Sequence, residues 1–213
     1  MTKSEKRSAH AKSAKKTPKA TKPWDVPIFP KHGDIDVQIL YATVGHALTR
    51  WEAMEERLAH LFSILIGLHD PSEIAERAYG AVVTFRGRKE MIERAADLYF
   101  GLFPDATIKS MFDEAMLYAQ GFAARRNEIA HGKVTSFLKP DKTLEFLMQP
   151  PTYASNKIKW YGDINYLYNS AIINNLAVGF DSTFVRVDRL ARAIAARHPR
   201  PESHEEPLPH NSE

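Results

Sequence analysis

The chain has 213 residues, 44% of them apolar, which is enough to bury a sizeable core in one domain. It contains no cysteine, so disulfides, thiolate metal sites and cysteine nucleophiles are excluded. The net charge is +3, and the lack of a secretory signal or of a membrane-length apolar run predicts a cytoplasmic protein with no membrane partner.

The charge is distributed unevenly along the chain. Residues 1–22 contain eight Lys and Arg but only one acidic residue, a net charge of about +7, whereas residues 199–213 carry about −3. The basic tail has no aliphatic Leu, Ile or Val and no aromatic residue, so it cannot offset the entropy of ordering. We predict disorder for it and for the acidic, Pro-rich C-terminal tail, with a single domain at residues 23–198. The basic tail is interpreted as a nucleic-acid-binding arm or as a solubilising tail.

The domain begins with an extended, Pro-rich strap at residues 24–32, in which Trp24, Ile28 and Phe29 are expected to pack on the body. Apolar residues then recur every three or four positions from about residue 35 to residue 68, which predicts a long amphipathic helix. Asp34 is expected to cap this helix.

The same periodicity predicts more helices after the first one. Asp70 and Pro71 have the residue types of an N-cap and a first helical position, which predicts a short helix reaching about Val82. The next two helices are predicted over residues 88–103 and 107–131. Pro104 ends the first of these two.

Two short stretches, residues 133–138 and 143–148, flank a turn with Pro140 at its second position and predict a β-hairpin. A third short strand is expected at residues 157–161. Asn169-Ser170 then caps a last helix that ends near Arg197. The predicted fold class is therefore all-α, a helical bundle with a small β-hairpin inserted before the last helix.

The segment at residues 125–132 (RRNEIAHG) closes the helix that precedes the hairpin. Gly132 suggests a left-handed helix cap, which places His131 in the final turn, where the carbonyl end of the helix favours a cation. Asn127 and His131 are four residues apart and share a helix face. Arg126 lies about 140° from His131, and only its long side chain lets it approach the imidazole.

These residues resemble the motif of the HEPN superfamily, which is an Arg, four to six residues and a His, often with a polar residue directly after the Arg. Here the motif reads Arg126, Asn127 and, four residues later, His131. The resemblance covers roughly residues 34–197 and outside the motif rests on helix order. It implies a HEPN-like bundle, a homodimer that pairs two motifs, and RNA cleavage that leaves a 2′,3′-cyclic phosphate and a 5′-hydroxyl. Arg125 also fits the looser spacing, so both arginines are candidates.

Cleavage of RNA without a metal requires a base for the 2′-hydroxyl, a cation for the pentavalent phosphate and a group that orients them. His131 suits the first role, and Arg126 suits the second because its planar fork can hold two phosphate oxygens. Asn127 can orient the imidazole or bind a phosphate oxygen. One Arg and one His leave the second proton transfer unassigned, which favours a second copy. No phosphate-binding glycine loop or metal motif is present, so neither a cofactor nor a metal is expected.

Two functions follow from this pattern. The first is a metal-independent endoribonuclease, acting as a toxin or antiphage effector on RNA, with an antitoxin protein as a candidate partner. The second is a non-catalytic helical module that binds nucleic acid or a protein through the basic tail. In that second reading one of the two arginines pairs with Glu128, and His131 is only a favourable C-terminal cation. Three carboxylates of the first helix are interpreted as a solvated face: Glu52, Glu55 and Glu56.

Overall fold

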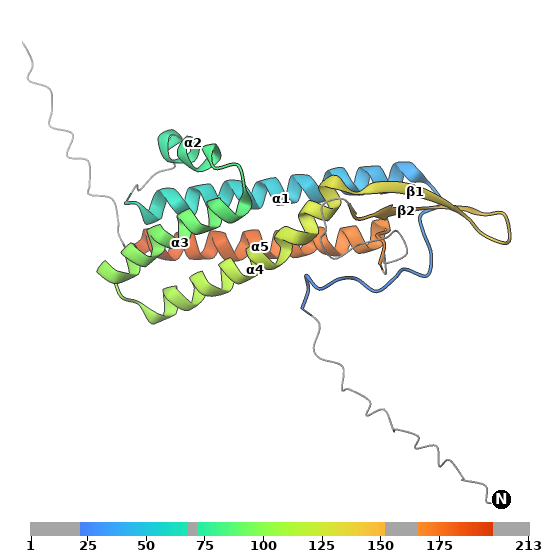
Figure 1. The fold of residues 1–213 in the computed structure, drawn as a ribbon. Coiled ribbons are helices and arrows are strands. Elements are labelled where there is room, and N and C mark those ends of the chain that lie inside the picture. The colour runs from blue at the N-terminus through green and yellow to red at the C-terminus, as the bar shows by residue number, and fades with distance from the viewer. Residues whose placement is uncertain (1–21, 68–71, 152–165, 198–213) are drawn as a thin grey trace, which may run out of the picture.

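A computed structural model describes residues 22–67, 72–151 and 166–197. The described residues form a helical bundle with one antiparallel hairpin before the last helix, which confirms the predicted all-α class (Figure 1). The elements are α1 (Val37–Leu65), α2 (Glu73–Ala81), α3 (Phe85–Leu102), α4 (Ala106–His131), β1 (Lys133–Leu138), β2 (Leu144–Gln149) and α5 (Ser170–Arg197). Apart from Lys22, both expected tails lie outside the described residues, as does the strand expected at residues 157–161. No helix in the described ranges is long and apolar enough to cross a membrane.

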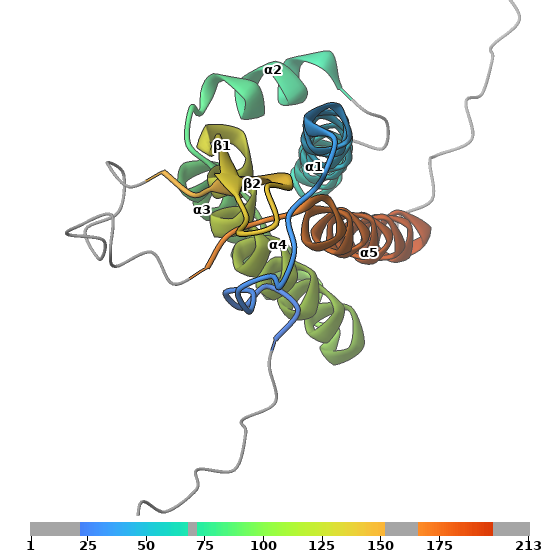
Figure 2. The same ribbon diagram turned by 90° about the vertical axis from the view of Figure 1, so that its right-hand side faces the viewer.

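The core lies where α1, α4 and α5 meet, with α1 and α5 side by side along their length (Figures 1 and 2). Trp51 of α1 contacts Phe180 of α5 at a ring-centroid distance of 5.3 Å, and Phe122 of α4 contacts Phe180 at 5.5 Å. All three side chains are almost fully buried. Burying each such side chain stabilises the fold by roughly 1.5–3 kcal/mol, so this junction fixes how α4 lies against α1.

Polar side chains cap the starts of α1 and α5, and the residue expected to cap α1 was wrong. The N-cap of α1 is Asp36, which accepts a hydrogen bond from the backbone two residues on at 2.8 Å. Asp34 instead accepts from the backbone N–H of Ser170 at 2.8 Å, and its own backbone pairs with Phe146. It therefore joins the start of α5 to the hairpin. Asn169 caps α5 as predicted.

Side-chain caps are found at the starts of α3 and α4, whereas Ser72 at the start of α2 makes no capping hydrogen bond with its side chain. Ser72, and not Asp70, occupies the N-cap position of α2, while Asp70 and Pro71 lie outside the described residues. Helix α3 begins three residues earlier than predicted because Thr84 accepts from a backbone N–H of the first turn at 3.1 Å. Asp105 accepts from two backbone N–H groups at the start of α4, which satisfies donors that have no partner within the helix.

The predicted hairpin is confirmed, with β1 and β2 paired from Lys133 opposite Gln149 to Leu138 opposite Leu144. The free edge of β2 makes bridges to Asp34 and Tyr168. The hairpin is thereby attached both to the segment before α1 and to the segment before α5, and it continues directly from the end of α4.

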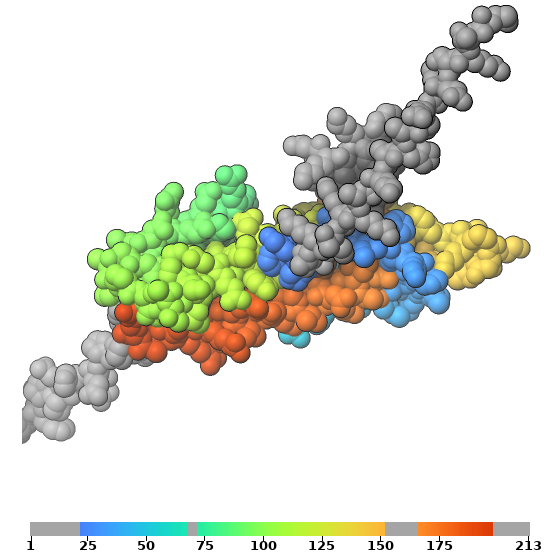
Figure 3. All heavy atoms as spheres, turned by 90° about the horizontal axis from the view of Figure 1, so that it is seen from below, coloured from blue at the N-terminus to red at the C-terminus, as the bar shows by residue number. Residues whose placement is uncertain are grey.

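The strap before α1 packs only in part as predicted. Trp24 makes edge contacts with the rings of Tyr118 and Phe122 at centroid distances of 5.0 and 5.6 Å. Ile28 and Phe29 are 90% and 50% exposed, so the expectation that they pack on the body was wrong. In Figure 3 the strap, in blue, lies against the surface formed by α4 and α5.

Candidate functional site

The last turns of α4 present the predicted motif to a polar cleft. Arg126, Asn127 and His131 all line this cleft, which has a volume of about 370 Å³ and lies between α4, the middle of α1 and the start of α3. His131 is exposed, and its side chain has no hydrogen bond or ion pair within the described part of the chain. The structure therefore brings the three predicted site residues together and leaves the imidazole accessible.

Arg126 is held at the wall of the cleft by a carboxylate of α1. Its Nη2 donates to Oε1 of Glu52 at 2.9 Å, and its Nη1 donates to Oδ1 of Asn127 at 3.3 Å. Its buried Nε has no hydrogen-bond partner among the described residues. The Glu52 side chain is 60% exposed. Because exposed ion pairs contribute only about 0–1 kcal/mol, this pair holds the guanidinium weakly.

The floor of the cleft is a buried polar network around Glu55. This carboxylate accepts from Trp51 Nε1 at 3.2 Å, from the Tyr79 hydroxyl at 2.9 Å and from Arg88 Nη1 at 3.0 Å. Burial, and next the negative charge of Glu55, raise the pKa of Tyr79. Glu56 is exposed as expected, but the interpretation of Glu55 as part of a solvated face was wrong. The Arg88 guanidinium is therefore paired with the Glu55 carboxylate.

Arg125 faces a different environment from Arg126. It is buried, its Nη2 lies 2.8 Å from Oε1 of Glu128, and its Nη1 donates to the Tyr168 hydroxyl at 3.4 Å. Glu128 also accepts from the hydroxyls of Tyr166 and Tyr168. Burial, and next the Glu128 carboxylate, raise the pKa of both tyrosines. Arg125 thus forms the pair with Glu128 that one sequence interpretation anticipated, and it does not line the cleft.

Gly132 follows the last residue of α4 in an extended conformation with a close contact to β2, and not as the expected left-handed cap. Its φ is −68° and its ψ is 157°, so the expected left-handed conformation was wrong. A Cβ at this position would lie 2.7 Å from the carbonyl oxygen of Glu128 and 2.9 Å from the Met148 side chain. Only glycine therefore lets β2 approach the end of α4 so closely.

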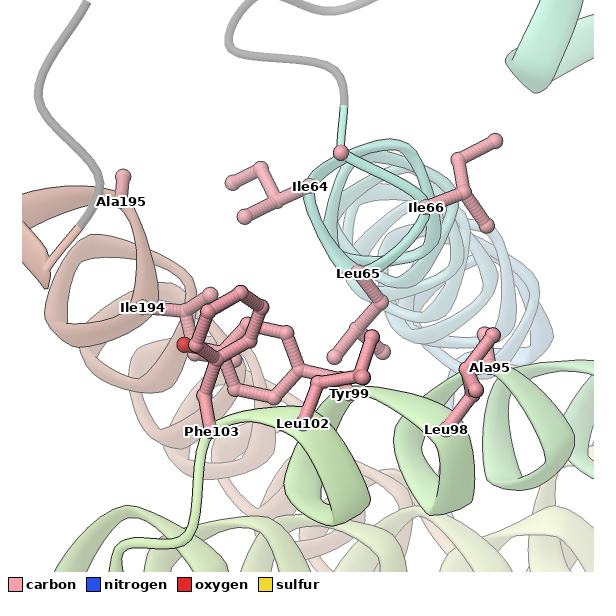
Figure 4. Close-up of a pocket in the computed structure, with 11 residues that line it drawn as sticks. Ile64, Leu65, Ile66, Ala95, Leu98, Tyr99, Leu102, Phe103, Ile194 and Ala195 are labelled. Atoms are coloured by element: carbon pink, nitrogen blue, oxygen red, sulfur yellow. The ribbon is translucent and has the colours of Figure 1, made fainter.

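A second cavity, of about 420 Å³, lies where α1, α3 and α5 end (Figure 4). Its walls are the end of α1, α3 and the end of α5, and nearly all of the lining side chains are apolar, including Leu65, Leu102 and Ile194. The described residues that line it include no pair of groups suited to acid–base chemistry. The polar cleft is therefore the better candidate site.

No protein-family model, curated protein or solved structure matches the chain. The assignment of the site consequently depends on the geometry of the cleft and on the motif. Within the described ranges, no group of three or more His, Asp or Glu side chains is placed to hold a metal ion. What the cleft offers chemically is an accessible imidazole, a guanidinium and an amide.

The sequence interpretation missed the contributions of Glu52, Glu55 and Arg88, which come from helices other than α4. Glu55 carried a signal that could have revealed its burial. It lies four residues after Trp51 and three before Leu58, so it falls on the apolar face of α1. Nothing local marks Glu52, because its partner Arg126 is 74 residues away in the chain.

Proposed function

We propose that the chain is a metal-independent endoribonuclease whose active site is the polar cleft. The observation that carries the proposal is that His131, whose side chain is exposed and has no partner among the described residues, shares one cleft with Arg126 and Asn127. A neutral imidazole can accept the proton of a 2′-hydroxyl, and a guanidinium can stabilise the charge that develops on the phosphate. Asn127, within hydrogen-bond distance of Arg126, helps to orient that guanidinium.

In the proposed reaction the 2′-oxygen attacks the adjacent phosphorus while its proton passes to His131. The bond from phosphorus to the 5′-oxygen breaks, which leaves a 2′,3′-cyclic phosphate and a 5′-hydroxyl. The departing 5′-oxygen needs a proton, and His131 is the single imidazole among the described residues that line one copy of the cleft. A second copy across a two-fold axis would supply the other imidazole, because a closed dimer places equivalent surfaces face to face.

The proposal is tested by incubating purified wild type, His131→Ala and His46→Ala with total RNA in the presence of EDTA. His46 is a matched control, because it is exposed on α1 and lies outside the cleft. Wild type and His46→Ala should cleave, whereas His131→Ala should be slower by about 10² or more. Equal cleavage by all three proteins, or no cleavage by wild type, would contradict the proposal.

A second candidate function is a non-catalytic module that binds nucleic acid through the basic tail. The ion pair between Arg126 and Glu52 favours it, because this pairing neutralises the cation that the ribonuclease requires. In that case RNA binding would depend on residues 1–22 and would be unaffected by His131→Ala. A gel shift that depends on residues 1–22, with no cleavage of the bound RNA by wild type, would favour this second function over the ribonuclease.

A further inference from the structure

Glu52 and Arg126 form an ion pair at the wall of the cleft. Oε1 of Glu52 lies 2.9 Å from Nη2 of Arg126, on the guanidinium fork that lines the cleft. Carboxylates and phosphates bind such a fork through the same geometry, two oxygens facing two N–H groups. The Glu52 carboxylate therefore occupies a position in which a phosphate oxygen would bind.

We propose that Glu52 competes with a substrate phosphate for Arg126 and thereby lowers the affinity of the cleft for its ligand. This inference rests on the proposed function and names what limits ligand binding at the same site. Two anions on one guanidinium repel each other, so a phosphate that binds Arg126 displaces the carboxylate. Displacement is feasible because the Glu52 side chain is 60% exposed and can turn into water.

The other ion pair of the cleft cannot exchange in this way. The Glu55 side chain is only 8% exposed and accepts from three donors, including Arg88. Moving Arg88 onto a phosphate would leave an uncompensated buried carboxylate, which is strongly unfavourable. Among the described residues that line the cleft, Arg126 is therefore the cation that can exchange its carboxylate partner for a phosphate.

The test measures binding of a 2′-O-methyl oligonucleotide, which lacks the nucleophile and cannot be cleaved by the proposed reaction. Fluorescence anisotropy is recorded at about 0.15 M salt, where the Debye length is about 8 Å, for full-length wild type, Glu52→Gln and Glu56→Gln. Glu56 is the matched control, because it is exposed on the same helix and its substitution changes the charge equally. Glu52→Gln should bind about fivefold more tightly, since a negative charge in contact with the phosphate position is removed. Glu56→Gln should change the affinity less than about twofold, because its more distant charge is screened.

A double variant assigns the gain to Arg126. If Glu52 acts by occupying the guanidinium, Glu52→Gln should produce no gain in an Arg126→Ala background. The proposal is overturned if Glu52→Gln and Glu56→Gln behave alike, if Glu52→Gln weakens binding, or if the gain persists without Arg126.

The result of this binding test can be distinguished from the result of the cleavage test of the proposed function. Cleavage by wild type with no effect of Glu52→Gln would remove the competition and retain the ribonuclease. An Arg126-dependent gain in a protein that cleaves no RNA would retain the phosphate site and remove the ribonuclease.

Discussion

Arg125 and Arg126 are adjacent in the chain, yet α4 directs their guanidinium groups to carboxylates in different parts of the molecule. Nη2 of Arg125 lies 2.8 Å from Glu128, and Nη2 of Arg126 lies 2.9 Å from Glu52. The divergence follows from the advance of about 100° per residue along a helix. The Arg125 side chain is 9% exposed and that of Arg126 is 30% exposed, so the first pair is structural and the second is available to a ligand.

The two arginines should therefore differ in their effect on stability. Arg125→Ala should lower the free energy of unfolding by about 3 kcal/mol, because it leaves the Glu128 carboxylate without its cation in a largely buried site. Arg126→Ala should lower it by less than about 1 kcal/mol. Urea unfolding followed by circular dichroism measures both values, and equal losses would show that this division of roles is wrong.

The elements that follow from local signals were predictable from the sequence, and those that depend on distant contacts were not. The hairpin around Pro140 and the cap at Asn169 could be predicted, because the groups that interact there lie within a few residues of each other in the chain. Asp34 was misassigned because its hydrogen-bond partner, Ser170, is 136 residues away. Gly132 was misread because what excludes a Cβ there includes Met148 on β2.

The same distinction between local signals and distant contacts applies to the candidate site. The spacing of residues 126, 127 and 131 on one helix predicted that they lie near one another, and all three line one cleft. The carboxylate that pairs with Arg126 comes from α1, and that pairing depends on how α1 packs against α4. Sequence periodicity gives the buried face of each helix, but it does not give the register between two helices.

Two glycines test the packing of the long helices. In α5, a Cβ on Gly179 would lie 2.3 Å from the ring of Phe122, which is 1% exposed and cannot move freely. Gly179→Ala should cost roughly 1–3 kcal/mol through overpacking. Gly45→Ala on α1 is the control, because nothing lies within 4 Å and the loss of backbone freedom should stabilise the fold by about 0.5–1 kcal/mol. A neutral Gly179→Ala, measured by thermal unfolding, would mean that α4 and α5 lie further apart.

The buried tyrosines should make the protein sensitive to alkali. Burial, and next Glu128, raise the pKa of Tyr168 above its ordinary value of 10.0. Above about pH 10 the unfolded chain releases this proton while the folded chain retains it, so stability falls as the pH rises. Tyr168→Phe should show a shallower fall in the free energy of unfolding at alkaline pH. An unchanged slope would indicate that Tyr168 titrates normally in the folded protein.

The basic tail should affect binding and not chemistry. Deleting residues 1–21 removes most of the charge of about +7 in that region, so RNA binding should weaken and its salt dependence should flatten. The single-turnover rate at saturating RNA should stay within a few-fold of wild type, because the cleft is retained. Loss of the saturated rate on deletion would mean that the active site had been assigned to the wrong part of the chain.

In the proposed mechanism, Arg126 and His131 together promote attack of the 2′-hydroxyl on the adjacent phosphorus. This mechanism is tested most directly by mass spectrometry of the products that wild type forms from a defined RNA, with the rate of their formation compared between wild type and Arg126→Ala. We predict fragments ending in a 2′,3′-cyclic phosphate with 5′-hydroxyl partners, formed at least about 10²-fold more slowly by Arg126→Ala because one stabiliser of the transition-state charge is lost. Fragments with a 5′-phosphate, or cyclic phosphate formed by Arg126→Ala at the wild-type rate, would contradict the account.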